Sequence, residues 1–413
     1  MLTNIETTVN NQRYVEPLPM SAVYNKQQFI TQFASLHHHS IQPVLVHQLL
    51  ATQANISLND TTSSYFPHTV AEFWILYDDL HRPIACAGAN TAMADSSVGY
   101  VGLFEARDVD AGVIVLNAAT NWLRRGGVGQ FQPVRQILGP VNLTTWLHYR
   151  LRVDDDPAPS MSYEPDHPKF YQTAFAKLCS FLCGADHKAG FVKAVDYYTM
   201  YYDMDPFIDR LSKYCKDVPL ESTGFALQAW NTLDFTASLN PERHPALSAE
   251  DNVARRVYDL SIRMFGGKDL FDEQVTRETH RRVVLNDLIS RPEVDLASLL
   301  DLSSFVVDIK TGQDVGYLAC WVENQDTLVM KTVGYVPEVH HTRVFAYTIL
   351  ETNKRARQAW GCTRNALALM NDRTTSQTEY IVGPSTRHVY RLYVHKPQVD
   401  GTGPITSYGP TLS

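Results

Sequence analysis

Polar and aromatic side chains gather directly after Gly139–Pro140, and their types suit the recognition of a small charged molecule. Trp146 and Tyr149 offer flat aromatic surfaces, and Arg150 carries a planar guanidinium that can bind a carboxylate through two parallel hydrogen bonds. Arg150 can equally form a structural ion pair with Glu164, so both interpretations stay open. The candidate substrate-binding residues are Asn142, Thr145, Trp146, Tyr149, Arg150 and Glu164.

Cysteine, histidine and aspartate residues show no spacing typical of a metal site. Cys179 and Cys183 are close enough to share one face of a helix, but two thiols are too few for structural zinc. Consecutive histidines at 37–39 cannot converge on one ion, and the aspartates at 154–156 precede a proline, which favours a solvated turn. The six cysteines form no disulfide framework. We therefore expect no metal.

The elements that must position these residues can be predicted from periodicity. Alternation with a period of two predicts an antiparallel hairpin of residues 72–77 and 84–90, and a third strand over 98–104. The period then changes to about 3.6, with Asp108 as the expected N-cap of a helix that ends at Gly126–Gly127. The first half is completed by an apolar strand at 136–142, a helix at 168–181 and a strand at 191–202, and an earlier short strand is expected at 44–46.

The second half repeats this order of elements without obvious sequence identity. Its expected helix over 342–360 has apolar residues on one face and Gly361 as its cap. The other expected elements are strands at 225–230, 305–309, 315–322, 327–336, 366–370 and 389–394, and helical stretches at 249–265 and 272–288.

A length of 413 residues favours two domains, and 44% hydrophobic residues suffice for two cores. The boundary falls within 203–219, where no Gly/Ser-rich linker occurs, so we expect the halves to pack against each other. The predicted division is a flexible N-terminus (1–14), a first domain (15–210), a second domain (211–399) and a tail (400–413).

Charge and hydropathy exclude several classes of partner. The formal net charge of −8 argues against a sequence-independent grip on DNA. No apolar run reaches the ~18–20 residues that span a bilayer, and the polar N-terminus does not resemble a signal peptide. We expect a cytoplasmic protein without a membrane segment.

The order of elements resembles the GNAT (Gcn5-related N-acyltransferase) fold, present twice in tandem. In the second half, K-T-V-G-Y-V-P-E at 331–338 resembles the family's fourth strand and its exit, and residues 369–393 resemble its C-terminal strands. In the first half, the element G-P-x-x-x-x-T-W-x-x-Y-R at 139–150 resembles a bacterial GNAT-like group. The resemblance implies an α/β (α+β) fold class, with two modules that each hold a mixed, mostly antiparallel twisted sheet flanked by helices.

The resemblance also implies direct acyl transfer from acyl-CoA or another phosphopantetheine thioester to the amine of a small molecule. Such chemistry needs a donor cradle of backbone amides, a base for the amine and an acid for the leaving thiolate. His340 or Glu338 is the implied base and Tyr380 the implied acid. Arg343 could reach the pyrophosphate as a charge, or lie exposed at a helix start. The implied donor-binding residues are Val333, Gly334, Tyr335, Val336, His341, Thr342, Arg343, Val344, Phe345 and Ala346.

Both pyrophosphate loops depart from the family pattern of Gln/Arg-x-x-Gly-x-Gly/Ala. The second half has H-H-T-R-V-F-A at 340–346, and the first half has no glycine before Gly112. Three hypotheses follow: an acyltransferase that uses acyl-CoA or an acyl carrier protein, a Fem-like transferase that uses aminoacyl-tRNA, and a non-catalytic binding or scaffold protein.

Overall fold

The computed structural model of the chain describes residues 14–19, 69–92, 97–142, 150–156, 161, 169–175, 191–233, 253–265, 294–340 and 342–395. The expected strand at 44–46 and the helical stretch at 272–288 lie outside these residues. Within the described part of the chain, no helix is long and apolar enough to cross a membrane.

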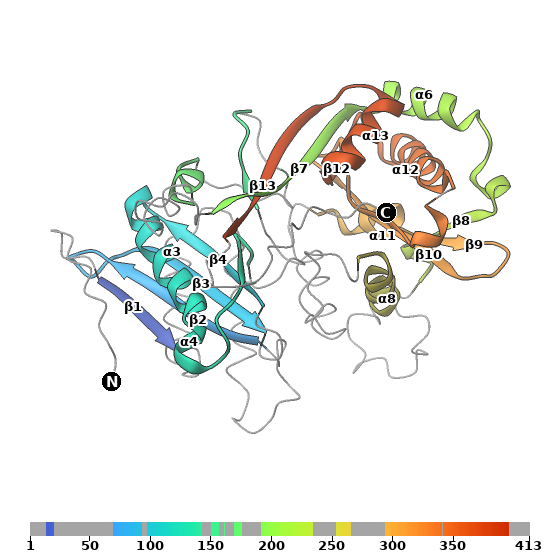
Figure 1. Cartoon of the computed structure of the whole chain (residues 1–413). Helices are drawn as coiled ribbons and strands as arrows, with labels where there is room; N and C mark the ends of the chain where they lie inside the picture. The colour runs from blue at the N-terminus through green and yellow to red at the C-terminus, as the bar shows by residue number, and fades with distance from the viewer. Residues whose placement is uncertain are drawn as a thin grey trace.

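In the first half, the described residues form seven strands and one long helix, α3 (Figure 1). Its elements are β1 (Tyr14–Pro19), β2 (Thr69–Tyr77), β3 (Pro83–Ala92), β4 (Val98–Ala106), α3 (Val109–Arg124), α4 (Gly126–Gly129), β5 (Gln136–Gly139), β6 (Leu151–Arg152) and β7 (Val192–Asp203).

The second half contributes the remaining strands and five α-helices to the described structure. Its elements are α6 (Met204–Cys215), η1 (Leu220–Thr223), β8 (Phe225–Ala229), η2 (Trp230–Thr232), α8 (Val253–Phe265), α11 (Leu296–Leu302), β9 (Ser304–Asp308), β10 (Asp314–Glu323), β11 (Thr327–Tyr335), η4 (Pro337–Val339), α12 (Val344–Trp360), β12 (Arg364–Asn371), α13 (Asp372–Val382) and β13 (Thr386–His395).

The helix boundaries expected from the sequence are confirmed where a cap was named. Asp108 caps α3 by accepting a hydrogen bond from the amide of Ala111 at 2.8 Å. Gly361 ends α12 in the left-handed region at φ 67°, where a glycine is free of the Cβ penalty.

Two strand predictions are wrong in part. The strand expected over 136–142 ends at Gly139, and beyond it only an isolated bridge at Val141 continues beside β4. The segment 372–382, which resembled C-terminal strands, is the helix α13: the side chain of Asn371 caps it by accepting from the amide of Thr374. Its buried positions, Thr375, Thr378 and Val382, recur at helical spacing.

The described strands form one mixed sheet, in which the order of strands in the second half mirrors that in the first. The order is β1-β2-β3-β4-β5-β13-β7-β12-β11-β10-β9-β8, with β6 beside β13. Among the described strands, only β4–β5 and β11–β12 pair in parallel, and the other neighbours are antiparallel. Each half therefore runs from its edge strand through three antiparallel strands to one parallel pair, and the α/β fold class with mixed, mostly antiparallel sheet halves flanked by helices is confirmed.

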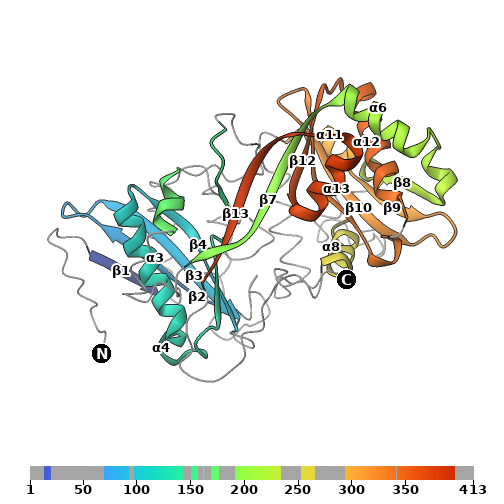
Figure 2. The same cartoon turned by 45° about the horizontal axis from the view of Figure 1, so that its top comes forward.

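The two halves share their central strands, β7 and β13. β13, the last strand of the chain, pairs with β5 of the first half, whereas β7 of the first half pairs with β12 of the second. β7 and β13 also pair with each other over most of their length, and both views show them crossing together between the two lobes (Figures 1 and 2). The division at 210/211 thus stays a prediction, because each central strand hydrogen-bonds to strands from both halves.

Helices cover the sheet so that each lobe has its own core. α3 packs on β2, β3 and β4 in the first lobe. In the second lobe α12 packs on α6 and β11, while α8 packs on β10 and β11. Gly334 lies under Met264 of α8, and the neighbouring Tyr335 bonds Thr348 of α12, so α8 and α12 lie on opposite faces of β11.

Candidate functional site

The two parallel pairs separate partway along their length, which creates one split in each half. β4 pairs with β5 only over Val98–Tyr100, and β11 pairs with β12 only over Thr327–Met330. Next to each split, one strand carries a one-residue bulge. In the first half it is β4, whose register shifts against β3, and in the second half it is β11, whose register shifts against β10. Such a bulge next to a split can leave backbone amides unpaired on that edge of the strand.

In the first half the protein's own side chain fills the split. Asn142 Oδ1 accepts a hydrogen bond from the backbone amide of Leu103 at 2.7 Å, and the amide of Val141 donates to the carbonyl oxygen of Val101. The chain approaches β4 so closely that a Cβ on Gly102 would lie 1.9 Å from the carbonyl oxygen of Val141. Asn142 is 5% exposed, so it completes the backbone of β4 and does not line an open groove.

The end of β4 beyond this split is also closed. The hydroxyl of Tyr171 donates to Glu105 Oε2 at 2.8 Å and accepts from the amide of Ala106 at 2.9 Å. Burial, reinforced by the charge of Glu105, raises the pKa of Tyr171 far above its usual range, so the phenol keeps its proton. Tyr171 and Phe175 pack on Phe104, which fills the space beside the strand.

The turn after β4 has the wrong length and charge for a phosphate group. Only residues 107 and 108 connect β4 to α3, so no loop is present to wrap around an anion. Asp108 occupies the N-cap and Asp110 lies in the first turn of α3. Two carboxylates at a helix N-terminus take the place that an anion would need and repel it.

The corresponding turn of the second half is long and free of acidic side chains at the helix start. Residues 336–343 connect β11 to α12. Arg343 is the N-cap residue of α12 without a side-chain capping bond, and the first turn of the helix contains no acid. A helix start with a neighbouring guanidinium favours negative charge, so this end of α12 suits a phosphate group.

Backbone groups of β11 face the second split. The amide of Val336 donates to the carbonyl oxygen of Val315 in β10 at 2.9 Å. Because backbone groups alternate along a strand, those of Val333 and Tyr335 point away from β10, toward the side where β12 has separated. His340 Nε2 lies 3.0 Å from the carbonyl oxygen of Tyr335, so that nitrogen carries the proton and donates it.

The implied acid and base lie in different surroundings. Glu338 is exposed on η4, and His340 Nε2 is hydrogen-bonded to the carbonyl oxygen of Tyr335. Tyr380 is 89% exposed on α13, a helix and not the expected strand. The catalytic roles of these three residues stay predictions.

The implied donor-binding residues lie around the second split, and they differ in how far they are exposed to solvent. Tyr335, Val336, Val344 and Ala346 are buried, as is Gly334 under α8. Val333, Thr342 and Phe345 are half-buried, and Arg343 is exposed with its guanidinium 5.0 Å from the ring of Tyr214. His341 lies outside the described residues.

Among the candidate substrate-binding residues, only Asn142 and Arg150 belong to the described part of the chain; Thr145, Trp146, Tyr149 and Glu164 lie outside it. Arg150 is 5% exposed, and its guanidinium lies 3.8 Å over the ring of Tyr197 on β7. Burial lowers its pKa to about 10, which still leaves it cationic at neutral pH. Arg150 thus packs against a central strand, and its pairing with Glu164 stays a prediction.

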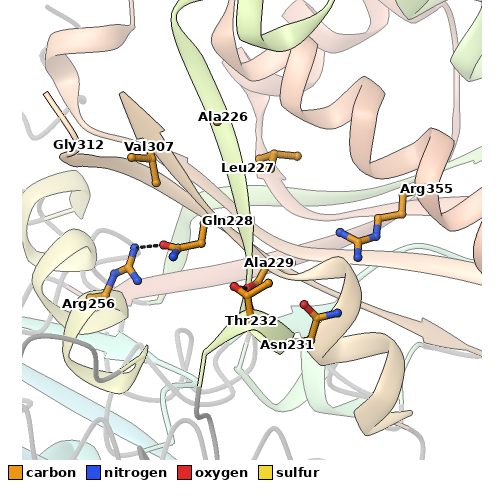
Figure 3. A pocket seen from close by; sticks show the side chains of 10 residues that line it. All are labelled: Ala226, Leu227, Gln228, Ala229, Asn231, Thr232, Arg256, Val307, Gly312 and Arg355. Atoms are coloured by element: carbon orange, nitrogen blue, oxygen red, sulfur yellow. Dashed lines mark hydrogen bonds between the residues drawn. The ribbon is translucent and has the colours of Figure 1, made fainter. Parts of the chain in front are cut away.

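Neither a metal cluster nor the open groove along β8 coincides with the second split in the described part of the chain. The residues that the structure describes contain no group of three or more His, Cys, Asp and Glu side chains placed to hold a metal ion. An open groove of about 590 Å³ runs along the edge strand β8, between Arg256 of α8 and Arg355 of α12 (Figure 3). Since β9 and β10 separate β8 from β11, this groove is remote from the split.

Sequence reasoning missed a polar residue pair on the α8 face of the second split. Tyr317 of β10 is hydrogen-bonded to Ser261 of α8 at 2.9 Å, and both are buried. No local pattern joins residues 56 positions apart. The available signal was the small, polar Ser261 in the apolar stripe of an amphipathic helix.

No family model and no curated protein matches this chain. Among solved structures, a tandem GNAT protein from the clavulanic acid biosynthesis pathway aligns over 93% of this chain and 98% of its own, at 11% identity and a TM-score of 0.47. A GCN5-related N-acetyltransferase from Sphaerobacter thermophilus aligns over 95% and 99%, at 13% identity and a TM-score of 0.45. A fungal multi-domain GH3 β-N-acetylglucosaminidase with a GCN5-related glucosamine N-acetyltransferase region aligns over 94% of this chain but only 38% of its own, at 11% identity and a TM-score of 0.48. Likenesses below a TM-score of 0.5 carry no argument about activity or substrate.

Proposed function

We propose that this protein is an N-acyltransferase whose donor thioester binds in the second half, while the first half serves as a structural partner. The observation that carries the proposal is the asymmetry between two otherwise matching splits. Asn142 bonds the backbone amide of Leu103 at the first split, and Asp108 caps the helix beside it. The second split has a long connecting segment at 336–343 and a cationic helix start at Arg343.

The residues of the second half fit a thioester donor of the acyl-CoA or acyl-carrier type. The start of α12 and Arg343 would hold the phosphate groups of the donor. The pantetheine arm would lie along β11, where the backbone groups of Val333 and Tyr335 face the gap left by β12. Backbone amides in such a gap polarise a thioester carbonyl and stabilise the oxyanion that develops on it.

The proposed acyl transfer changes no oxidation state, and its bonds and protons balance between the thioester and the amine. The lone pair of the acceptor amine attacks the carbonyl carbon of the thioester, the carbon–sulfur bond breaks, and an amide bond forms. The amine loses one proton and the leaving thiolate gains one. The acceptor is proposed to be a small-molecule amine.

Binding of CoA tests the proposal directly. CoA, acetyl-CoA and a short phosphopantetheine thioester are titrated into the full chain by isothermal calorimetry, and the unfolding temperature is followed in parallel. A donor at 100 times its Kd adds ~2.7 kcal/mol to the free energy of unfolding, which shifts the transition clearly upward. Release of free thiol is then measured with acetyl-CoA and a panel of primary amines. The proposal fails if none of the three compounds binds.

A non-catalytic role is the second candidate, and the closed first split supports it. The first split is filled by Asn142 and flanked by the Tyr171–Glu105 bond, which supports a role of that half in binding or architecture without acyl transfer. Binding of CoA without thiol release for any amine would favour this role over catalysis. A Fem-like transferase has less support, because a net charge of −8 opposes a grip on tRNA.

A further inference from the structure

The strand β8 forms one edge of the sheet and borders the open groove of about 590 Å³ (Figure 3). Its inner edge pairs with β9, and within the described part of the chain no strand pairs with its outer edge. Ala226, Leu227 and Gln228 line the groove and are half-buried. The outer edge of β8 is therefore open to a partner along this groove.

The register of β8 against β9 fixes which backbone groups face outward. The amide of Trp230 donates to the carbonyl oxygen of Ser303 at 3.0 Å, and the amide of Ile309 donates to the carbonyl oxygen of Gly224 at 2.9 Å. Backbone groups alternate along an antiparallel strand, so the even-numbered residues face β9, and Leu227 presents its N–H and its C=O to the outer edge. An extended segment alongside β8 can exchange a pair of hydrogen bonds with Leu227.

The two edges of the sheet differ in their protection against further pairing. β1, at the opposite edge, contains Pro17 and Pro19, which have no N–H to offer an added strand. β8 has the sequence F-A-L-Q-A, without a proline or a charged residue. β8 therefore keeps a capacity for strand pairing that the prolines restrict in β1.

Two arginines flank the groove, Arg256 from α8 and Arg355 from α12, and the described residues that line it include neither Asp nor Glu (Figure 3). Arg256 binds Asp314 and Gln228 through Nε and Nη2. Arg355 binds Asp301 through Nη2. Within the described residues, Nη1 of each guanidinium makes no hydrogen bond, so each can bind a further carboxylate. The groove thus favours an acidic partner.

We propose that β8 docks an extended, acidic peptide segment of a partner protein, which adds to the sheet as an outer strand. Leu227 supplies the main-chain hydrogen bonds, while Arg256 and Arg355 bind acidic side chains. Since consecutive side chains of a strand point to opposite faces, two adjacent acidic residues reach both arginines, whereas two acids separated by one residue reach only one. The docking goes beyond acyl transfer and does not depend on it.

Fluorescence anisotropy with labelled octapeptides tests the docking on the full chain, without donor or amine. The peptide S-V-T-E-E-T-V-S should bind about tenfold more tightly than its isomer S-V-E-T-E-T-V-S, in which both acids share one face. The peptide S-V-T-K-K-T-V-S should bind weakest, since lysines meet the two arginines with like charge. The advantage of the adjacent acids should shrink as ionic strength rises.

Variants of the chain separate the main-chain bonds from the charges. Leu227→Pro removes the outward N–H and no bond to β9, so the Kd for the peptide with adjacent acids should rise at least about tenfold. Leu227→Ala keeps the N–H and is the matched control, with a Kd within about threefold of the wild-type value. Arg355→Gln should raise the Kd about fivefold, and Asp301 keeps its bonds from Asn231 and Trp360.

The docking is overturned if the peptide with adjacent acids does not bind, or if the two isomers bind equally. A dimer of the free chain that Leu227→Pro dissociates, as measured by light scattering, would also overturn it, because a second copy would then occupy the edge. Circular dichroism checks the fold of each variant. Should Leu227→Pro fail to fold, N-methylation of both glutamate amides in the peptide replaces it: this blocks both edges of the peptide, and unchanged binding to the wild-type chain would overturn the docking.

Discussion

Asn142 and Leu103 are separated by 39 positions in the chain, yet the side-chain oxygen of Asn142 lies 2.7 Å from the backbone nitrogen of Leu103. The bond closes the first split by supplying the acceptor that a neighbouring strand would otherwise provide. Leu103 adopts the left-handed region at φ 45°, which turns its amide out of the regular ladder of β4. The first half thus maintains a bulged strand by an internal contact at the position where a donor-binding module needs a vacant amide.

Replacement of Asn142 by alanine should destabilise the protein without affecting the donor. The amide of Leu103 would be left buried and unsatisfied, which costs about 1–3 kcal/mol in the free energy of unfolding. Urea denaturation measures this loss, and the Kd for CoA should stay unchanged because the proposed donor site lies in the other half. Asn231→Ala is the matched control, since the amide of Asn231 is exposed and its loss should cost less than about 0.5 kcal/mol. Tighter CoA binding by Asn142→Ala would instead show that the first split is a usable slot.

Arg343→Gln should weaken CoA binding about tenfold, because a charge-assisted bond to a phosphate would be lost at the start of α12. The expected change is an increase in Kd that shrinks as ionic strength rises, since exposed charges are screened by salt. Arg357→Gln on the same helix is the control: its guanidinium is paired with Asp205 far from the helix start. Calorimetry at two salt concentrations measures both variants. Equal effects of the two substitutions would remove Arg343 from the donor site.

Local patterns of the sequence predicted most of the helices and strands, but they did not predict the helix α13. Asp108 and Gly361 mark helix ends through capping chemistry that acts within a few residues. The segment 372–382 carries polar residues at its buried positions, Thr375 and Thr378, so hydrophobic periodicity gave no helical signal there. The shared strands were out of reach for another reason: pairing of β13 with β5 joins residues more than 200 positions apart.

The candidate site was predictable where it depends on consecutive residues and not where it depends on contacts across the sheet. The segment Lys331–Glu338 does form the bulged strand and its exit. The sequence placed the N-cap at Asp108 correctly, but the expected strand ended at residue 104, so the two-residue turn at 107 and 108 was not predicted. Burial of Asn142 and Arg150 was not, because both depend on how the chain after Pro140 returns to β4 and β7.

Glu72 should make the stability of the protein depend on pH between about 4 and 7. Burial raises its pKa to about 7 in the folded state, against about 4.3 in an unfolded chain. Between these values the unfolded state releases the proton and the folded state keeps it, so stability falls as pH rises through this window and then levels off. Glu72→Gln removes the ionisation, so it should stabilise the protein at pH 8 and have little effect at pH 4.5. Thermal unfolding at both pH values measures this, and an equal effect at the two would contradict it.

Neither half of the chain should fold without the other. Residues 1–210 alone lack β13, which lies between β5 and β7, and residues 211–413 alone lack β7, which lies between β12 and β13. Removal of β13 would expose Tyr390 and Leu392, both fully buried, and leave open strand edges that favour aggregation. We expect each half to be insoluble or to lack a cooperative unfolding transition, and co-expression of the two to restore a soluble complex with the transition of the intact chain. If the fragment 1–210 or 211–413 were monomeric and unfolded cooperatively, this would contradict the prediction and show that the domain can fold without the shared central strands. Co-expression with Tyr390→Asp in the second piece is the matched control, because a buried charge on β13 should prevent recovery.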